Sequence, residues 1–232
     1  MPLIANRLLT FSTLLLTLGV FTGSSAQEKA PCPCEGTAKP ASAKAEQKVV
    51  WKSLLSHGLD DWEVTRFGGE GEVLLKDKTL IIEMGHPISG VTYKKGDQLP
   101  KVNYELSVEA KRVLGNDFFC GLTFPIKESH CTLILGGWGG SLTGVSSING
   151  SDASENETSG SESFKSNQWY QVRVVVKEDR LEAWVDQTQL FDIETEGLSF
   201  DTRIEMDLSK PLGLATFETE AHYRNFQYRL LK

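Results

Sequence analysis

The sequence predicts an all-β fold, a two-sheet antiparallel β-sandwich of the concanavalin-like jelly-roll type. Three observations lead to this prediction. Apolar and polar side chains alternate along most of the chain, turn residues interrupt the alternation about every ten residues, and no segment longer than about ten residues shows a convincing helical period. Strands without helical crossovers pair antiparallel and bury one face each against a second sheet.

The clearest alternation lies in residues 103–113. One face carries Tyr104, Leu106, Val108 and Ala110, and the other carries Glu105, Ser107, Glu109 and Lys111. Further strands are predicted over residues 79–84, 118–124, 169–176, 180–185, 189–193, 212–217 and 222–231. The turns within 169–193 are so short that these strands should form a meander. We expect its two tryptophans, Trp169 and Trp184, to lie in the core.

The chain divides into three parts. Residues 1–26 resemble a signal peptide, because Arg7 precedes an apolar run too short to span a bilayer and small residues follow it. Residues 27–48 are rich in Pro, Ala, Lys and Glu and read as a disordered linker. Residues 49–232 form the sandwich domain. No lipobox precedes Cys32, so we expect a secreted or periplasmic product without membrane insertion of the mature protein.

Charge and motifs exclude several classes of function. The chain has 24 Lys and Arg against 31 Asp and Glu, a formal net charge of −7, which argues against nucleic acid as a partner. The motifs of serine hydrolases and of nucleotide-binding loops are missing from the sequence. The four histidines follow no metal-binding spacing, so we predict no transition-metal site and no cofactor.

Cysteines leave two alternatives open. Cys120 and Cys131 flank a predicted hairpin, so they form either a disulfide or two buried free thiols.

Several blocks together resemble the 3-keto-disaccharide hydrolase domain, a family with a concanavalin-like jelly roll. They are "LLSHGLDDWEV", "NYELSVEAKR" followed by "GND", "NQWYQVRVVV" with "RLEAWVDQTQLFD", and "YRNFQYRLL", from about Trp51 to Leu231. The resemblance implies a secreted, sugar-active protein, as in many polysaccharide-degrading bacteria. It implies roles in sugar binding or chemistry for Glu105, Glu109, Asn116, Arg224 and Asn225. Where the family shows a Glu followed by Gln-Ile-Leu-Asp, residues 131–137 read CTLILGG instead.

Glu109 is the predicted acid or base. Glycoside cleavage usually needs two carboxyl groups about 5 to 9.5 Å apart. Glu105 and Glu109 share a strand face roughly 13 Å apart, so they are not that pair. Elimination next to a keto group needs only one base, which a single glutamate provides.

The stretch "GGWGGSLTGVSSINGSDASENETSGSES" supplies the remaining predicted contacts. Trp138 lies between glycine pairs, so it either stacks on a sugar ring or covers the end of the core. Asp152 and Asn156 lie in a polar loop and are candidate sugar ligands, together with Asn116 and Arg224. Loop oxygens of Asn149, Asp152, Glu155, Asn156 and Glu157 also allow calcium, although they lack EF-hand spacing.

Two functions follow from the sequence. The first is a glycan-active hydrolase acting on glycosides or disaccharides of the 3-keto type, with Glu109 as catalytic group and Trp138 as stacking platform. The second is a non-catalytic carbohydrate-binding or adhesion module.

Overall fold

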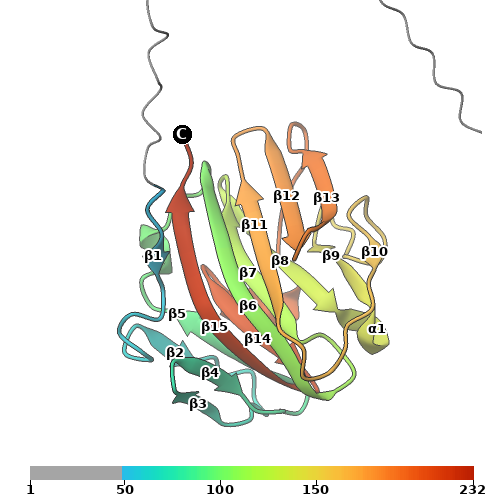
Figure 1. The fold of residues 1–232 in the computed structure, drawn as a ribbon. Helices are drawn as coiled ribbons and strands as arrows, with labels where there is room; N and C mark the ends of the chain where they lie inside the picture. Colours follow the sequence, from blue (N-terminus) through green and yellow to red (C-terminus); the bar gives the residue numbers. More distant parts are fainter. Residues whose placement is uncertain (1–48) are drawn as a thin grey trace, which may run out of the picture. The chain divides into compact units, whose positions relative to one another are not determined.

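Two antiparallel sheets packed face to face form the fold of the computed structural model, which describes residues 49–232 (Figure 1). The predicted all-β sandwich is confirmed. The predicted signal peptide and all of the linker, residues 1–48, lie outside the described residues. Among those that are described, no helix is long and apolar enough to cross a membrane.

Sheet A has eight strands and contains the long strands drawn in front in Figure 1. In spatial order they are β13 (Thr188–Glu194), β12 (Arg180–Val185), β11 (Tyr170–Val176), β6 (Tyr104–Gly115), β15 (Thr219–Leu230), β4 (Thr79–Ile82) and β3 (Val73–Lys76), with β1 (Lys52–Ser53) pairing with β15. The meander predicted for residues 169–193 is the run β11, β12 and β13.

Sheet B has seven strands and lies behind sheet A in the same view. Its order is β10 (Gly160–Ser161), β9 (Leu142–Ser146), β8 (Ser129–Gly136), β7 (Cys120–Ile126), β14 (Gly213–Phe217), β5 (Ile88–Tyr93) and β2 (Trp62–Val64). The described helical elements are all short: η1 (Gly96–Gln98), α1 (Gly137–Gly140) and η2 (Ile204–Ser209).

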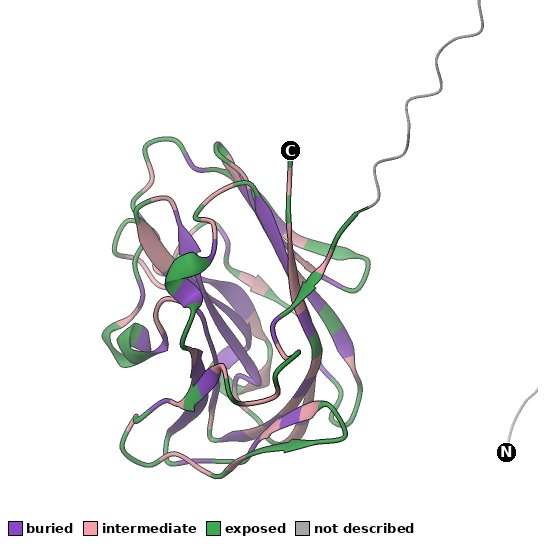
Figure 2. Cartoon of the chain, turned by 90° about the vertical axis from the view of Figure 1, so that its left-hand side faces the viewer, coloured by how far each residue is buried: buried purple, intermediate pink, exposed green. Residues whose placement is uncertain are grey.

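The core lies between the sheets and follows the pleat of each strand (Figure 2). On β6, Tyr104, Leu106, Val108 and Ala110 are fully buried, as the alternation predicts. On β7 and β8 the inward residues include Leu122, Phe124, Leu133 and Leu135. Because strand side chains alternate, the residues between these positions lie on the two outer faces of the sandwich.

Both cysteines of the predicted hairpin are free, buried thiols. In the β7–β8 ladder Cys120 pairs with Leu135 and Cys131 with Phe124, so the two are four residues apart along the hairpin. Burial raises the pKa of the Cys120 thiol to about 12 and that of Cys131 well above its ordinary value. The free-thiol alternative is the one that the structure shows.

The core positions predicted for Trp169 and Trp184 are wrong. Trp184 alternates with Leu181, Ala183 and Val185, which point inward, so its indole lies half-buried on the outer face of sheet A. There the Arg173 guanidinium lies 5.1 Å from the Trp184 ring centroid, and the Arg224 guanidinium lies 4.2 Å from that of Trp169. The indoles cover charged side chains rather than fill the core.

Candidate functional site

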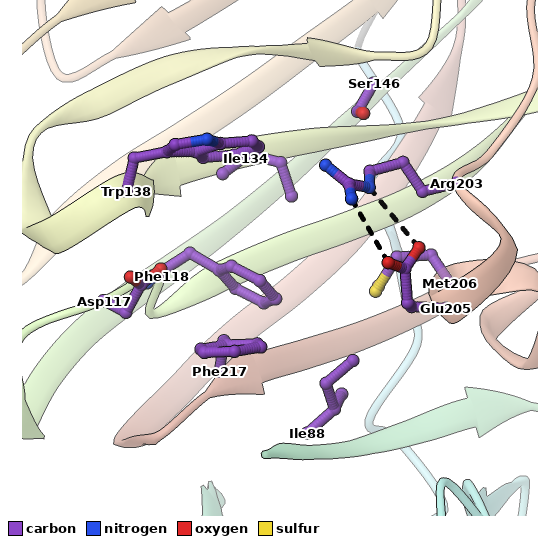
Figure 3. Close-up of a pocket in the computed structure, with 10 residues that line it drawn as sticks. All are labelled: Ile88, Asp117, Phe118, Ile134, Trp138, Ser146, Arg203, Glu205, Met206 and Phe217. Carbon is purple, nitrogen blue, oxygen red and sulfur yellow. Dashed lines mark hydrogen bonds and ion pairs between the residues drawn. The ribbon is translucent and has the colours of Figure 1, made fainter. Parts of the chain in front are cut away.

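A pocket on the outer face of sheet B is the candidate site, and we call it the Trp138 pocket. It has a volume of about 290 Å³. Its lining residues are Ile88, Asp117, Phe118, Ile134, Trp138, Ser146, Arg203, Glu205, Met206 and Phe217 (Figure 3). They come from β5, β8, β9 and β14, from the turn before β7, from α1, and from η2 with the residue preceding it.

The floor of the pocket is apolar because a second, smaller cluster of buried side chains covers this face of the sheet. Ile88, Phe118, Ile134, Met206 and Ala215 belong to the cluster, and Phe217 packs against it. The rings of Phe118 and Phe217 lie 5.8 Å apart in a tilted arrangement. Ile134 is here because its neighbours Leu133 and Leu135 point into the main core. Figure 3 shows the indole of Trp138 on the far side of the pocket from Phe217.

Trp138 is presented to solvent by a tight turn at the end of β8. The short element α1 is not a regular helix, since Trp138 has φ 48° and Gly139 has φ 89°. Asp117 holds the turn from below: its Oδ2 accepts a hydrogen bond from the Gly139 N–H at 3.0 Å, and its Oδ1 accepts one from the Phe118 N–H at 2.7 Å. The indole remains 48% exposed. A bulky residue in the left-handed region is costly and characteristic of functional sites.

Arg203 forms the polar wall of the pocket. Its Nη1 donates to Asp152 Oδ2 at 2.7 Å and its Nη2 to Glu205 Oε1 at 3.2 Å, as the dashed lines of Figure 3 show for Glu205. The guanidinium lies 5.8 Å from the Trp138 ring centroid. The Arg203 hydrogen bond holds the pKa of Glu205 below its usual value, so this exposed carboxylate is charged at neutral pH.

Ser146 adds a buried hydroxyl to the pocket. The residue is 1% exposed, and its Oγ has no hydrogen-bond partner among the described residues. Buried hydroxyls normally have a partner, so the Ser146 hydroxyl is free to bond to a group that enters the pocket.

The predicted loop ligands are used largely within the protein. Asp152 Oδ1 accepts hydrogen bonds from the N–H and the Oγ of Ser154. Burial raises the pKa of Asp152, but these hydrogen bonds and the nearby Arg203 together lower it by more, so the pKa is below its ordinary value. Asn156 donates to the carbonyls of Val145, Ser151 and Asp152 and accepts from Thr158. Asp152 reaches the Trp138 pocket through Arg203, whereas Asn156 only shapes the loop.

This loop lies directly against sheet B. A Cβ at Gly144 would come within 2.9 Å of the Ala153 carbonyl oxygen, so only glycine permits the approach. Among the residues that the structure describes, no group of three or more His, Cys, Asp or Glu side chains is arranged to hold a metal ion. The calcium alternative therefore gains no preformed site here.

Glu109 and Arg224 lie on the outer face of sheet A, on the other side of the sandwich. Glu109 Oε2 accepts a hydrogen bond from Arg224 Nε at 2.7 Å, and its Oε1 accepts one from Asn225 Nδ2 at 2.6 Å. The structure therefore separates Glu109 from Trp138 by both sheets. The catalytic role predicted for Glu109 stays a prediction, and both of its oxygens already have partners.

Glu105 lies on the same outer face but is buried, with 2% of the residue exposed. Its Oε1 accepts from Arg173 Nη1 at 3.2 Å and its Oε2 from Arg229 Nε at 2.6 Å. Because both carboxylate oxygens are paired and covered, Glu105 has no free group for a ligand in this structure.

Asn116 is exposed in the turn before Asp117 and lines a separate hollow on the other side of the Trp138 turn. Sequence reasoning missed Asp117, Phe118, Arg203, Glu205 and Phe217. No local pattern in the sequence distinguishes Arg203 or Glu205.

Comparison with known proteins identifies the family to which the chain belongs. Residues 51–229 match the family described as 3-keto-alpha-glucoside-1,2-lyase-like domain. The chain belongs to this family, which confirms the resemblance seen in the sequence and places the protein among carbohydrate-active β-sandwiches. A search of curated protein sequences finds no match.

Solved structures share the fold at low identity. One comes from work on endo-acting O-glycanases that members of the human gut microbiota express to initiate mucin breakdown, with 13% identity, a TM-score of 0.54, and 80% of this chain and 100% of that chain covered. A Bacillus subtilis protein of unknown function with a galectin-like fold has 9% identity and a TM-score of 0.52, covering 79% and 97%. The Crh5 transglycosylase has 11% identity and a TM-score of 0.50, covering 79% and 84%.

Proposed function

We propose that the Trp138 pocket is a carbohydrate-binding site. The observation that carries the proposal is the half-exposed indole of Trp138, held by the Asp117 turn above an apolar floor. A flat aromatic face packs well on the C–H face of a sugar ring, and a few polar groups at the rim then fix its hydroxyls. Arg203, Glu205 and Ser146 are placed for those contacts.

Binding of neutral oligosaccharides to Trp138→Ala tests this proposal. By calorimetry on a panel of glycans, we expect the substitution to weaken binding at least tenfold and Trp138→Phe to retain most of the affinity. Trp169→Ala is the matched control, because it removes an indole from the opposite face of the sandwich. Equal affinity in the wild type and in folded Trp138→Ala would place the sugar elsewhere.

Turnover of 3-keto-glycosides or disaccharides at the same pocket is the second candidate function. Membership of a lyase-like family and the charged Glu205 carboxylate at the pocket favour it. The step is an elimination: Glu205 accepts the proton from the carbon next to the keto group, a double bond forms to the anomeric carbon, and the glycosidic oxygen leaves and takes up a proton. Water added to that double bond completes a net hydrolysis.

Turnover measurements with 3-keto-glucosides distinguish an enzyme from a binding module, and they distinguish Glu205 from Glu109 as the base. If Glu205 is the base, Glu205→Gln loses turnover by about a hundredfold or more, while Glu109→Gln remains active. The reverse pattern would support the base predicted from the sequence. A wild type that binds glycans and turns over no keto-sugar is a binding module.

Export is part of the proposal. The charged and apolar order of residues 1–26 supports it, and the mature protein should then begin at Gln27. N-terminal sequencing of protein recovered outside the cytoplasm tests this, and an intact Met1 terminus there would contradict it.

A further inference from the structure

A second hollow lies on the other side of the Trp138 turn, and we call it the Arg112 pocket. Its volume is about 440 Å³. It is lined by Arg112, Asn116, Gly139, Gly140, Ser141, Ser161, Glu162, Ser163 and Phe164. Gly139 follows Trp138 directly, so one turn of chain contributes to both pockets (α1 in Figure 1).

Arg112 is a buried cation whose hydrogen bonds are largely unmet. It follows Ala110 on the inward face of β6 and is 8% exposed. Its Nη2 donates to the Phe164 carbonyl at 2.6 Å, and its guanidinium lies 5.8 Å from the Phe119 ring centroid. Its Nε and Nη1 are buried, and no acceptor among the described residues reaches them.

An arrangement of this kind is costly for a free protein. Buried charges are normally paired, and a guanidinium offers five N–H donors. Glu162 lines the same pocket, yet no carboxylate of the described residues forms an ion pair with Arg112. An external anion is a partner that would satisfy Nη1, the buried nitrogen that lies next to Gly140.

Two glycines, Gly139 and Gly140, lie over Arg112 and have no side chains to cover it. Gly140 has φ 114°, and a Cβ there would lie 3.2 Å from Arg112 Nη1 and 2.9 Å from the Asn116 carbonyl oxygen. A Cβ at Gly139 would meet nothing within 4 Å. Only backbone lies between Nη1 and solvent at these two glycines, so binding of a ligand to Nη1 requires the Gly139–Gly140 peptide to move outward. The Asn116 amide and Ser141 hydroxyl lie in the same hollow and can donate further hydrogen bonds.

We propose that the Arg112 pocket binds the acidic group of an anionic sugar, a carboxylate or a sulfate ester, while a neighbouring ring of the same glycan occupies the Trp138 pocket. A guanidinium N–H donates a strong, charge-assisted hydrogen bond to either group. The inference rests on the proposed carbohydrate site, because the shared turn is what joins the two pockets. It narrows the ligand to uronate-containing or sulfated glycans.

Two matched pairs of probes test the proposal and distinguish the two acids. One pair is an oligogalacturonate and its methyl ester, and the other is a sulfated and an unsulfated dextran oligosaccharide. By calorimetry at fixed ionic strength, the acidic member of at least one pair should bind at least tenfold more tightly than its neutral partner. Arg112→Met should abolish this preference and leave the affinity for the neutral member within twofold.

Arg180→Met is the charge-matched control, since Arg180 pairs with Asp192 and Glu194 at the far end of sheet A. It should keep the preference for the acidic probe. Arg112→Lys keeps the charge without the guanidinium and should retain only part of the preference, which preserves the test if Arg112→Met does not fold.

A preference that persists in Arg112→Met, or that the wild type lacks in both pairs, overturns the inference. The proposed carbohydrate site is judged separately, because it requires that neutral probes bind and that Trp138→Ala weakens them. If Trp138→Ala weakens neutral binding while acid preference is missing, only the inference about Arg112 fails.

Discussion

Removal of the charge of Glu105 should destabilise this protein more than removal of the charge of Glu109. The Glu105 side chain is 3% exposed and is paired with both Arg173 and Arg229. Those guanidinium groups lie over the rings of Trp184 and Trp51 at 5.1 and 5.0 Å, so they have little freedom to turn to solvent. Glu105→Gln keeps the shape of the side chain and leaves two facing cations without a counter-charge.

The magnitude follows from the exposure of the partners. Loss of one member of a fully buried ion pair costs about 3–5 kcal/mol. The Arg173 and Arg229 side chains are 29% and 28% exposed, so we expect about 2–3 kcal/mol after solvent screening. The Glu109 and Arg224 side chains are 26% and 42% exposed, so Glu109→Gln should cost about 1 kcal/mol.

Urea unfolding at pH 7, followed by tryptophan fluorescence, measures the difference directly. In thermal unfolding Glu105→Gln should lower Tm by about 5–10 °C and Glu109→Gln by about 2–4 °C. Equal losses, or a larger loss for Glu109→Gln, would refute the reasoning from burial. A folded Glu109→Gln that no longer binds or converts sugars would show that the outer face of sheet A has a direct functional role.

Three further predictions concern the glycines of the Trp138 turn, the reactivity of the buried thiols, and the loss of stability at low pH. Gly139→Ala and Gly140→Ala both place a Cβ at positive φ, but only the latter meets a backbone oxygen, at 2.9 Å; the first should cost about 1–2 kcal/mol and the second clearly more in the same urea assay. Cys120 and the second buried cysteine should not react with a thiol reagent at pH 8 until urea unfolds the chain, and fast native labelling would contradict their burial. The pKa of Glu205 in the folded state lies below its ordinary 4.5, so the ion pair with Arg203 stabilises the fold above that pH, and this stabilisation is lost as the pH falls further. The Tm difference between wild type and Glu205→Gln should be constant from pH 6 to 7 and shrink below pH 4.5. A constant difference down to pH 3 would disprove the pairing.

Local periodicity was sufficient to predict the sandwich and the core of its central strand. The inward set of β6, with Tyr104, Leu106, Val108 and Ala110, follows from a period of two. The same period also places Trp184 with Glu182 on an outer face. The prediction that Trp184 lies in the core is wrong because the alternation decides the face, and an indole on the outer face packs against a guanidinium.

The site was only partly predictable, because it depends on pairings between distant parts of the chain. Trp138 was singled out from its flanking glycines, but its partners Arg203 and Glu205 lie more than sixty residues later in the sequence. They reach the pocket because β14 pairs with β5 and β7 in sheet B and brings η2 with it. A strand's period tells which side chains share a face, but it does not tell in which sheet that face lies, so Glu109 and Trp138 could not be separated from sequence alone.

The two outer faces differ in what they leave for a ligand, and that difference is the strongest argument for where function lies. On sheet A, Glu105 and Glu109 have all their oxygens paired, and guanidinium groups lie 5.1 and 4.2 Å from the ring centroids of Trp184 and Trp169. Arg203 likewise pairs with both oxygens of Glu205, but it lies farther, at 5.8 Å, from the ring centroid of Trp138. On the outer face of sheet B, Trp138 is half exposed and the buried Ser146 hydroxyl has no partner among the described residues. Arg112, on the inward face of β6 next to the Trp138 turn, has two buried nitrogens without an acceptor among the same residues. Evolution rarely keeps strained turns and unmet hydrogen bonds without a ligand that uses them. Under the proposed function, a sugar at the Trp138 turn would use these donors, whereas a sugar over Glu105 or Glu109 would compete with ion pairs that stabilise the fold.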